Sequence, residues 1–264
     1  MDSRYIQFPY RKEIIMLLEL KKEIIYGPVH SRRLGPSLGL NILPPQKKTC
    51  TYNCLYCQYG WTDFSSEKGS FPSPEEVFSS LKKTLETLDE KPNAITFSGN
   101  GEPTLHPKFA QIVDGVIRLR DLYAPQSRTA ILSNSSTATR AHIQAALQSL
   151  DMRIMKMETG NQTFLENFNQ PAPSFRFDRI VKGLSALPDI TLQALFTKGP
   201  KGNSLEENIT AWIEALQIIQ PSFVQIYTLD RDCPSTSIEK MEINELSEIR
   251  ERLVNTGIQS DIFV

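Results

Sequence analysis

Short apolar runs alternate along the chain with longer stretches in which apolar residues recur every three or four positions. A run of about four to eight apolar residues is typical of a buried strand, whereas the longer period indicates one buried face of a helix. On this basis we predict six strands. They lie at residues 38–43, 94–97, 130–132, 153–157, 190–196 and 224–227.

Helices are predicted between these strands, and the first of them carries the clearest signals. Ser73 can cap its amino terminus, Pro74 suits the first helical position, and Glu76 completes a capping box. Further helical faces follow within residues 109–116, 143–150, 177–184, 205–216 and 238–253.

Strand and helix therefore recur six times. Such alternation predicts parallel βα units, and six units rather than eight predict an incomplete barrel. We expect an α/β protein that forms a partial (β/α)6 barrel in a single domain, with an N-terminal helical extension. The extension is placed at residues 1–26, around Ile14, Leu17, Leu18 and Ile24, and the barrel domain at residues 27–264.

Composition and charge indicate the cellular compartment of the protein more than they indicate its chemistry. The chain has 29 basic and 30 acidic side chains and a formal net charge of -1, so it lacks a global electrostatic signature of nucleic-acid binding. Near the amino terminus the longest apolar run is residues 14–18, which predicts neither a signal peptide nor a membrane span. Cysteine is scarce and mostly clustered, as suits a reducing compartment. We expect a cytoplasmic protein with no membrane partner.

The candidate chemistry lies in the stretch TCTYNCLYCQY, which holds Cys50, Cys54 and Cys57 in a C-x3-C-x2-C spacing. Thiolates are soft ligands that select zinc, copper(I) or iron-sulfur clusters. A 4Fe-4S cluster normally binds four cysteines, so three would leave one iron free to bind a small molecule. The alternative is a zinc site completed by His30 or Cys233.

With Tyr56 as its aromatic residue, this C-x3-C-x-aromatic-C loop resembles the cluster loop of the radical S-adenosylmethionine (SAM) superfamily. Downstream, residues 98–103 read SGNGEP and resemble the GGEP loop of that superfamily. Two motifs in the right order are more specific than either alone. Residues 27–39 and 224–231 are most similar to segments of its wyosine-synthase-like (Fe-S oxidoreductase) branch.

The resemblance implies two cofactors, a 4Fe-4S cluster and SAM, with Cys50, Cys54 and Cys57 as the protein's metal ligands. It implies that the amino and carboxylate groups of SAM bind the open iron, and that one electron from the reduced cluster releases a deoxyadenosyl radical. That radical would abstract hydrogen from the substrate. A reductant protein such as a flavodoxin or ferredoxin is implied as a partner. The substrate stays open, with RNA and a peptide among the options.

The resemblance of the SGNGEP loop and the positions of residues near the strand ends together predict which residues bind SAM. The predicted set is Tyr56, Gly99, Asn100, Gly101, Glu102, Pro103, Ser133, Asn134, Glu158, Tyr227 and Leu229. Glu102 would pair with the ammonium group, and the flanking glycines would let the backbone approach the cofactor. Asn100 stands where many relatives have a second glycine, and it adds a side chain near the cofactor.

Polar residues near strand ends supply the remaining assignments. Ser133, Asn134 and Glu158 are predicted ribose partners. Tyr56 and the segment 227–229 are predicted to flank the adenine, because aromatic and apolar groups favour contact with a flat ring.

Two further features have alternative interpretations. Cys233 follows the last predicted strand and is a candidate for a catalytic role, although an isolated cysteine usually behaves as a small buried hydrophobe. Arg32, Arg33 and Arg231 are either surface charges or ligands for a phosphate or carboxylate, since the arginine fork suits such groups.

The sequence thus predicts a radical SAM enzyme that abstracts hydrogen from its substrate. One alternative is a tRNA-modifying, wyosine-like enzyme, but wyosine synthases carry a second cysteine cluster ahead of the first, and no cysteine precedes Cys50 here. Another is a non-catalytic iron-sulfur protein that transfers electrons or acts as a sensor, which would need a fourth cluster ligand.

Overall fold

The computed structural model describes residues 17–65 and 69–264. Its strands form one eight-stranded sheet in which each strand pairs with its neighbours in sequence. The strands are β1 (Ile25–Ser31), β2 (Gly35–Leu40), β3 (Ala94–Phe97), β4 (Arg128–Ser133), β5 (Met152–Lys156), β6 (Ile190–Leu195), β7 (Phe223–Tyr227) and β8 (Ser260–Ile262). β1 pairs with β2 in antiparallel fashion, and the pairs from β2 to β8 are parallel.

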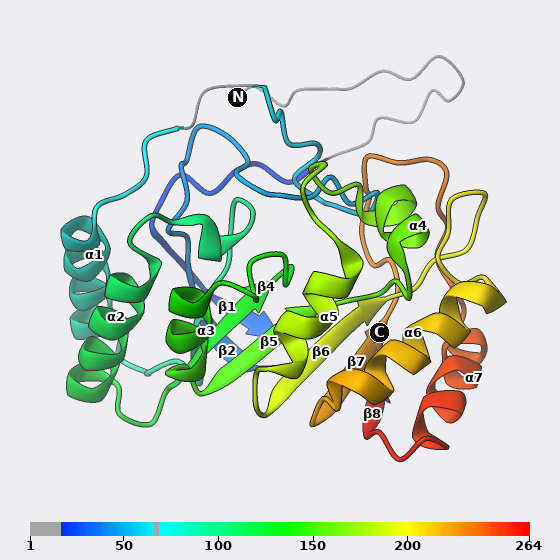
Figure 1. Cartoon of the computed structure of the whole chain (residues 1–264). Coiled ribbons are helices and arrows are strands. Elements are labelled where there is room, and N and C mark those ends of the chain that lie inside the picture. The colour runs from blue at the N-terminus through cyan, green and yellow to red at the C-terminus, as the bar shows by residue number, and fades with distance from the viewer. Residues whose placement is uncertain (1–16, 66–68) are drawn as a thin grey trace.

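Helices cover one face of this curved sheet (Figure 1). They are α1 (Pro74–Thr87), α2 (Phe109–Tyr123), α3 (Ala141–Gln148), α4 (Gln162–Phe164), α5 (Phe177–Ser185), α6 (Glu206–Ile219) and α7 (Ile243–Val254), with a 3-10 helix η1 (Pro103–Leu105) and a π-helix η2 (Leu165–Asn169). The strand–helix order confirms the predicted single α/β domain with a partial barrel. No helix in the described ranges is long and apolar enough to cross a membrane.

Side chains alternate along each strand between the face of the sheet that packs on the helices and the opposite, inner face. Ile95, Leu192 and Val224 are fully buried in the apolar core that the sheet shares with the helices. Their neighbours along the strands point to the opposite side. Two of these inner residues, Gln193 and Gln225, bond to each other at 2.9 Å. The inner face is therefore partly polar.

The six predicted strands correspond to β2 through β7, and the predicted capping box is confirmed. The Ser73 hydroxyl accepts from the Glu76 N–H at 3.2 Å, and the Glu76 carboxylate accepts from the Ser73 N–H at 2.7 Å. The prediction missed β1, which is largely exposed and lacks an apolar run, and the three-residue β8. It also began the last helix too early, because Ile238 packs in a separate small cluster ahead of α7.

The predicted N-terminal helical extension falls largely outside the described residues, which begin at residue 17. Residues 17–24 contain no helix, and β1 runs across the predicted boundary at residue 26. Tyr26 belongs to the sheet: its hydroxyl bonds to Ser98 at 2.6 Å, and its ring lies against Gly39. The division into residues 1–26 and 27–264 remains a prediction.

The turn of the β1–β2 hairpin reaches the far edge of the sheet. Arg32 forms a 2.9 Å ion pair with Asp230, just after β7. The Arg33 guanidinium lies 4.3 Å from the ring centroid of Tyr227 and 5.7 Å from that of Phe263. Side-chain contacts, rather than a backbone ladder, thus connect the two edges of the partial barrel within the described part of the chain.

Candidate active site

The cysteine loop follows β2 and folds into two consecutive turns. The Cys57 N–H donates to the Cys54 carbonyl at 3.0 Å, and the Gly60 N–H donates to the Cys57 carbonyl at 2.9 Å. The Lys48 ammonium donates to the Gly60 carbonyl at 2.6 Å and so ties the end of the loop back to its start. In Figure 1 this loop runs over the end of the sheet where the parallel strands finish.

The π-helix η2 holds the loop from the other side. The Leu55 N–H donates to the Phe168 carbonyl at 3.0 Å, and the Asn53 N–H donates to the Asn169 carbonyl at 3.0 Å. Asn169 was not among the predicted site residues. The sequence NQTFLENFNQ gives no motif for it, and its position depends on how η2 ends.

Two side-chain amides point at the thiols. Asn134 donates to the Cys50 sulfur at 3.4 Å, and Asn169 donates to the Cys54 sulfur at 3.3 Å. Burial raises the pKa of Cys50 to about 12, against the charge of Lys48, and burial together with Glu158 raises the pKa of Cys54 to about 11. Thiols of this kind lose their protons to a strongly cationic partner such as iron.

The three cysteines are neighbours but do not converge as a finished ligand set. In residues 17–65 and 69–264, no three His, Cys, Asp or Glu side chains meet closely enough to hold a metal ion. The donor chemistry nevertheless fits an iron-sulfur cluster. The loop supplies three soft sulfurs, and the amides of Asn134 and Asn169 supply the hydrogen bonds to sulfur that such clusters use. The assignment of Cys50, Cys54 and Cys57 as metal ligands stays a prediction.

The SGNGEP loop after β3 is fastened to the residue that precedes Cys50. The Thr49 N–H donates to the Asn100 carbonyl at 2.8 Å, and the Glu102 N–H donates to the Thr49 carbonyl at 2.9 Å. Gly101 has a φ of 141°, and a Cβ there would lie 1.9 Å from the Thr49 carbonyl oxygen. Glycine is required at this position because the backbone of the cysteine loop passes so close.

The neighbouring loop residues have structural contacts of their own. The Asn100 side chain bonds to the backbone of Lys21 at 2.7 and 2.8 Å and to the Pro44 carbonyl at 3.1 Å, so it holds other parts of this chain. A Cβ on Gly99 would lie 2.6 Å from the Asn41 side chain. Pro103 is buried and begins η1.

Glu102 is a buried carboxylate surrounded by neutral donors. It accepts hydrogen bonds from the Thr104 hydroxyl at 2.6 Å, the Thr104 N–H at 3.1 Å, the Ser133 hydroxyl at 3.0 Å and the Asn134 N–H at 2.6 Å. Burial raises its pKa, against the effect of these donors. Within the described residues Glu102 has no ion-pair partner. Buried charges are usually paired, so the site is suited to a cationic ligand.

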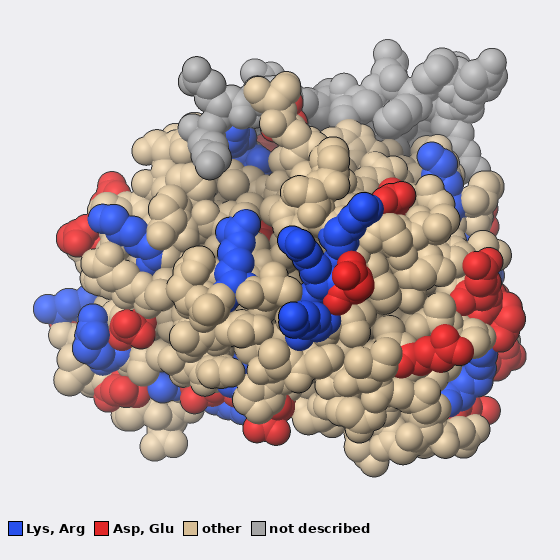
Figure 2. All heavy atoms as spheres, viewed as in Figure 1, with Lys and Arg blue, Asp and Glu red and all other residues tan. Residues whose placement is uncertain are grey.

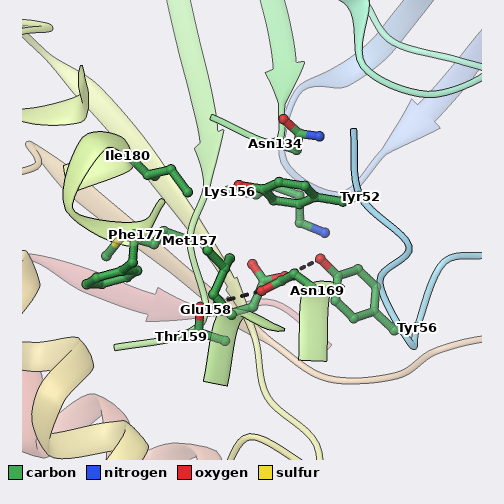
Figure 3. A pocket seen from close by; sticks show the side chains of 11 residues that line it. Tyr52, Tyr56, Asn134, Lys156, Met157, Glu158, Thr159, Asn169, Phe177 and Ile180 are labelled. Atoms are coloured by element: carbon green, nitrogen blue, oxygen red, sulfur yellow. Dashed lines mark hydrogen bonds between the residues drawn. The ribbon is translucent and has the colours of Figure 1, made fainter. Parts of the chain in front are cut away.

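A second buried carboxylate, Glu158, lies at the end of β5 (Figure 3). Its Oε1 accepts from the Tyr56 hydroxyl and, at 2.8 Å, from the Asn169 amide. Its Oε2 is buried without a partner in the described structure. The Lys156 ammonium lies 4.2 Å from the Tyr56 ring centroid and 5.6 Å from that of Tyr227. Glu158 and Tyr56, which were predicted separately, therefore meet in one polar group.

Lys156 was not predicted, although it precedes Glu158 by two residues. Because side chains alternate along a strand, residues two apart lie on the same side of the chain. This alternation could have placed Lys156 beside Glu158. Burial alone would lower the pKa of Lys156, but Tyr227 and Glu158 outweigh it, so its pKa is raised. A narrow cavity of about 10 Å³ lies among these residues.

The remaining predicted residues lie beside this group. Leu229 and Tyr227 pack against an apolar cluster that contains Leu55 and Phe168. Cys233 belongs to the same cluster, is 8% exposed, and donates its thiol hydrogen to the Ser235 carbonyl at 3.5 Å. Burial raises its pKa. These contacts favour the interpretation of Cys233 as a buried, neutral thiol.

Comparison with known proteins gives consistent results. Residues 47–209 match the family model described as the Radical SAM superfamily. A UPF0026 protein of Methanocaldococcus jannaschii is 32% identical over 231 residues, which are 86% of this chain and 70% of that protein.

Solved structures share the fold. A radical SAM methyltransferase from Sphaerobacter thermophilus superimposes with a TM-score of 0.65 at 11% identity, over 86% of this chain and 65% of that one. The structure of TYW1 with a lysine-pyruvate adduct bound superimposes with a TM-score of 0.60 at 12% identity, over 83% of this chain and 73% of that one. At such identities the likeness shows the fold alone.

The family match covers the segment in which the structure brings the cysteine loop, the SGNGEP loop and Glu158 together. The protein therefore belongs to the radical SAM superfamily, whose members are enzymes that use a 4Fe-4S cluster and S-adenosylmethionine.

Proposed function

We propose that this protein binds a 4Fe-4S cluster through Cys50, Cys54 and Cys57, cleaves SAM reductively and abstracts hydrogen from a substrate still to be identified. The supporting observation is a bridge between the two motif loops. Asn134 donates its backbone N–H to Glu102 and its side-chain amide to the Cys50 sulfur. Asn134 thus connects Glu102, a carboxylate suited to an ammonium group, with Cys50, a proposed cluster ligand.

Each of the chain's own groups has a role in this proposal. When bound, the reduced cluster supplies the electron that breaks a carbon–sulfur bond of SAM. Glu102 holds the ammonium group, because a buried carboxylate without a cation is completed by one. Asn134 and Asn169 orient the first two cysteines through their hydrogen bonds to sulfur.

The group around Glu158 would bind the nucleoside part of SAM. The unpartnered Oε2 of Glu158 can accept a hydrogen bond from a ribose hydroxyl. Tyr56, Tyr227 and Leu229 offer ring and apolar surface for the adenine. Ser133 orients Glu102, and residues 99–103 set the shape of the loop.

An electron carrier or sensor would instead need a fourth protein donor. The two residues considered for completing a zinc site are poorly suited to this role as well, since Cys233 is bonded to Ser235 inside an apolar cluster and His30 is exposed on β1. The electron for SAM cleavage would come from a reductant protein such as a flavodoxin or ferredoxin. We place the reaction in the cytoplasm.

The test is anaerobic reconstitution with iron and sulfide, followed by reduction in the presence of SAM. Deoxyadenosine is the expected product. Cys54→Ser should abolish its release, and Cys233→Ser, which also removes one thiol, should leave it unchanged. A stable cluster that never cleaves SAM would contradict the proposal.

A further inference from the structure

A second cavity lies at the opposite end of the sheet from the cysteine loop, among the residues that begin β2, β3, β4 and β5. Its volume is about 360 Å³, within the range of about 300–1,000 Å³ that is usual for small-molecule sites. Gly35, Ala94, Arg128 and Met152 each contribute from the first residue of a strand. The cavity is therefore the floor of the partial barrel, and we call it the floor cavity.

The floor cavity is cationic. Arg33 and Arg128 line it together with the amides of Asn93 and Gln126, and no Asp or Glu is among its lining residues. The carboxylate of Asp151, which precedes Met152 in the chain, accepts through its Oδ2 from Arg120 at 2.5 Å and from the Thr129 N–H at 2.7 Å.

Arg33 has unused hydrogen-bonding capacity. Its Nε is buried and has no hydrogen-bond partner, and its guanidinium contacts the rings of Tyr227 and Phe263 rather than a carboxylate. Neither Arg33 nor Arg128 has an ion pair in the described part of the chain. Leaving a buried charged donor unpaired is costly, so such a group is suited to a ligand that completes it.

We propose that the floor cavity binds a small molecule that carries an oxyanion, either a carboxylate or a phosphate. The guanidinium forks of Arg33 and Arg128 hold the oxyanion, because two parallel N–H donors match its geometry. The Asn93 and Gln126 amides supply further donors, and Leu34 and Met152 contact the carbon skeleton.

The floor cavity is connected to the candidate active site through two side chains. Arg33 lies on the Tyr227 ring at 4.3 Å, and the Lys156 ammonium lies 5.6 Å from the same ring. A ligand that moves the Arg33 guanidinium would thus act on a residue that contacts the Glu158 group. Binding itself requires neither cluster nor SAM, and it can be measured without them.

The test is a titration of the full chain with inorganic phosphate and, separately, with acetate, followed by the NMR signals of the arginine Nε–H groups. We expect saturable shifts of the Arg33 and Arg128 signals. Saturation by phosphate alone identifies a phosphate ligand, by acetate alone a carboxylate ligand, and by both the shared oxyanion chemistry.

Substitutions provide the second arm. Arg128→Gln, at an exposed residue whose side chain has no ion pair in the described ranges, should weaken anion binding at least about tenfold. Arg140→Gln removes the same charge at an exposed position outside the cavity and should leave the affinity unchanged. Arg33→Gln should also weaken binding, but Arg33 packs on Tyr227, so Arg128 provides the cleaner result. Absence of saturable binding by either anion, or equal weakening by Arg128→Gln and Arg140→Gln, would overturn the proposal.

Discussion

The two ends of the sheet differ in the charge that they present. The carboxyl ends of the strands carry two buried carboxylates beside the cysteine loop, Glu102 among neutral donors and Glu158 near Lys156. The amino ends surround a cavity lined by Arg33 and Arg128 and by no acidic residue. The face of the molecule shown in Figure 2, by contrast, carries both basic and acidic side chains. A buried charged group favours ligands of the opposite charge. The contrast indicates one end suited to the ammonium and sulfonium charges of SAM and another suited to an oxyanion.

Neutralising Glu102 is the strongest way to break this contrast. Glu102→Gln removes the charge that we assign to the ammonium group and loses one acceptor for the Asn134 N–H. We expect SAM to bind the reconstituted protein about a hundredfold more weakly, as for the loss of a charge-assisted buried pair. Equilibrium dialysis with labelled SAM measures this.

Glu158→Gln is the matched control, because it also neutralises a buried carboxylate at the same end. We assign Glu158 to a ribose hydroxyl, which is neutral, so Glu158→Gln should weaken SAM binding only about tenfold. Equal effects of the two substitutions, or wild-type affinity in Glu102→Gln, would argue against the assigned roles.

Gly101 tests whether the carboxyl end depends on close contact between its two loops. In Gly101→Ala the new Cβ would meet the Thr49 carbonyl at 1.9 Å and force the cysteine loop away. We expect the free energy of unfolding to fall by about 3 kcal/mol, from overpacking and backbone strain together. Urea denaturation measures the change.

Gly257→Ala serves as the comparison, since Gly257 also has a positive φ, of 88°, but a Cβ added there would meet no described atom within 4 Å. Backbone strain alone should cost about 1 kcal/mol there. If both substitutions cost the same, the close approach of Thr49 contributes nothing to stability.

Asp151, directly before β5, tests how charge contributes to stability at the amino ends of the strands. Burial alone would raise its pKa, but the Thr129 N–H and Arg120 lower it below its ordinary value. A lowered folded-state pKa contributes stability above the unfolded pKa of about 3.9, and this stability is lost as the pH falls through the folded pKa. Because Asp151 is partly exposed, Asp151→Asn should cost about 1 kcal/mol at neutral pH and progressively less below about pH 4.

Asp121→Asn is the control for this pH dependence. Asp121 pairs with the same Arg120 at 2.7 Å but is far more exposed, so its loss should change stability less. Urea denaturation of both variants across this pH range decides the matter. If the stability lost in Asp151→Asn does not depend on pH, packing rather than charge explains the effect of the substitution.

Local sequence signals predicted much of the fold and the two motif loops. Apolar runs identified β2 through β7, and the Ser73 capping box marked the start of α1. β1 escaped notice because an exposed strand has no apolar run. The last strand, β8, is only three residues long. Periodicity therefore finds the buried strands and misses the edges of the sheet.

The site was predictable where a motif defines it and not where distant segments meet. Cys50 and Glu102 belong to short motifs, whereas the Asn134 bridge between them depends on how three loops pack. Asn169 reaches the Cys54 sulfur only because η2 folds onto the cysteine loop. The contact of Arg33 with Tyr227 joins opposite edges of the sheet, and no local pattern encodes it.

The central claim is that Cys50, Cys54 and Cys57 hold a cluster whose remaining iron is free to bind SAM. Mössbauer spectroscopy of the iron-57 reconstituted protein, with and without SAM, tests it most directly. The account predicts that SAM changes the signal of a single iron site of the cluster and leaves the other sites as they were. A spectrum that SAM does not alter would contradict it.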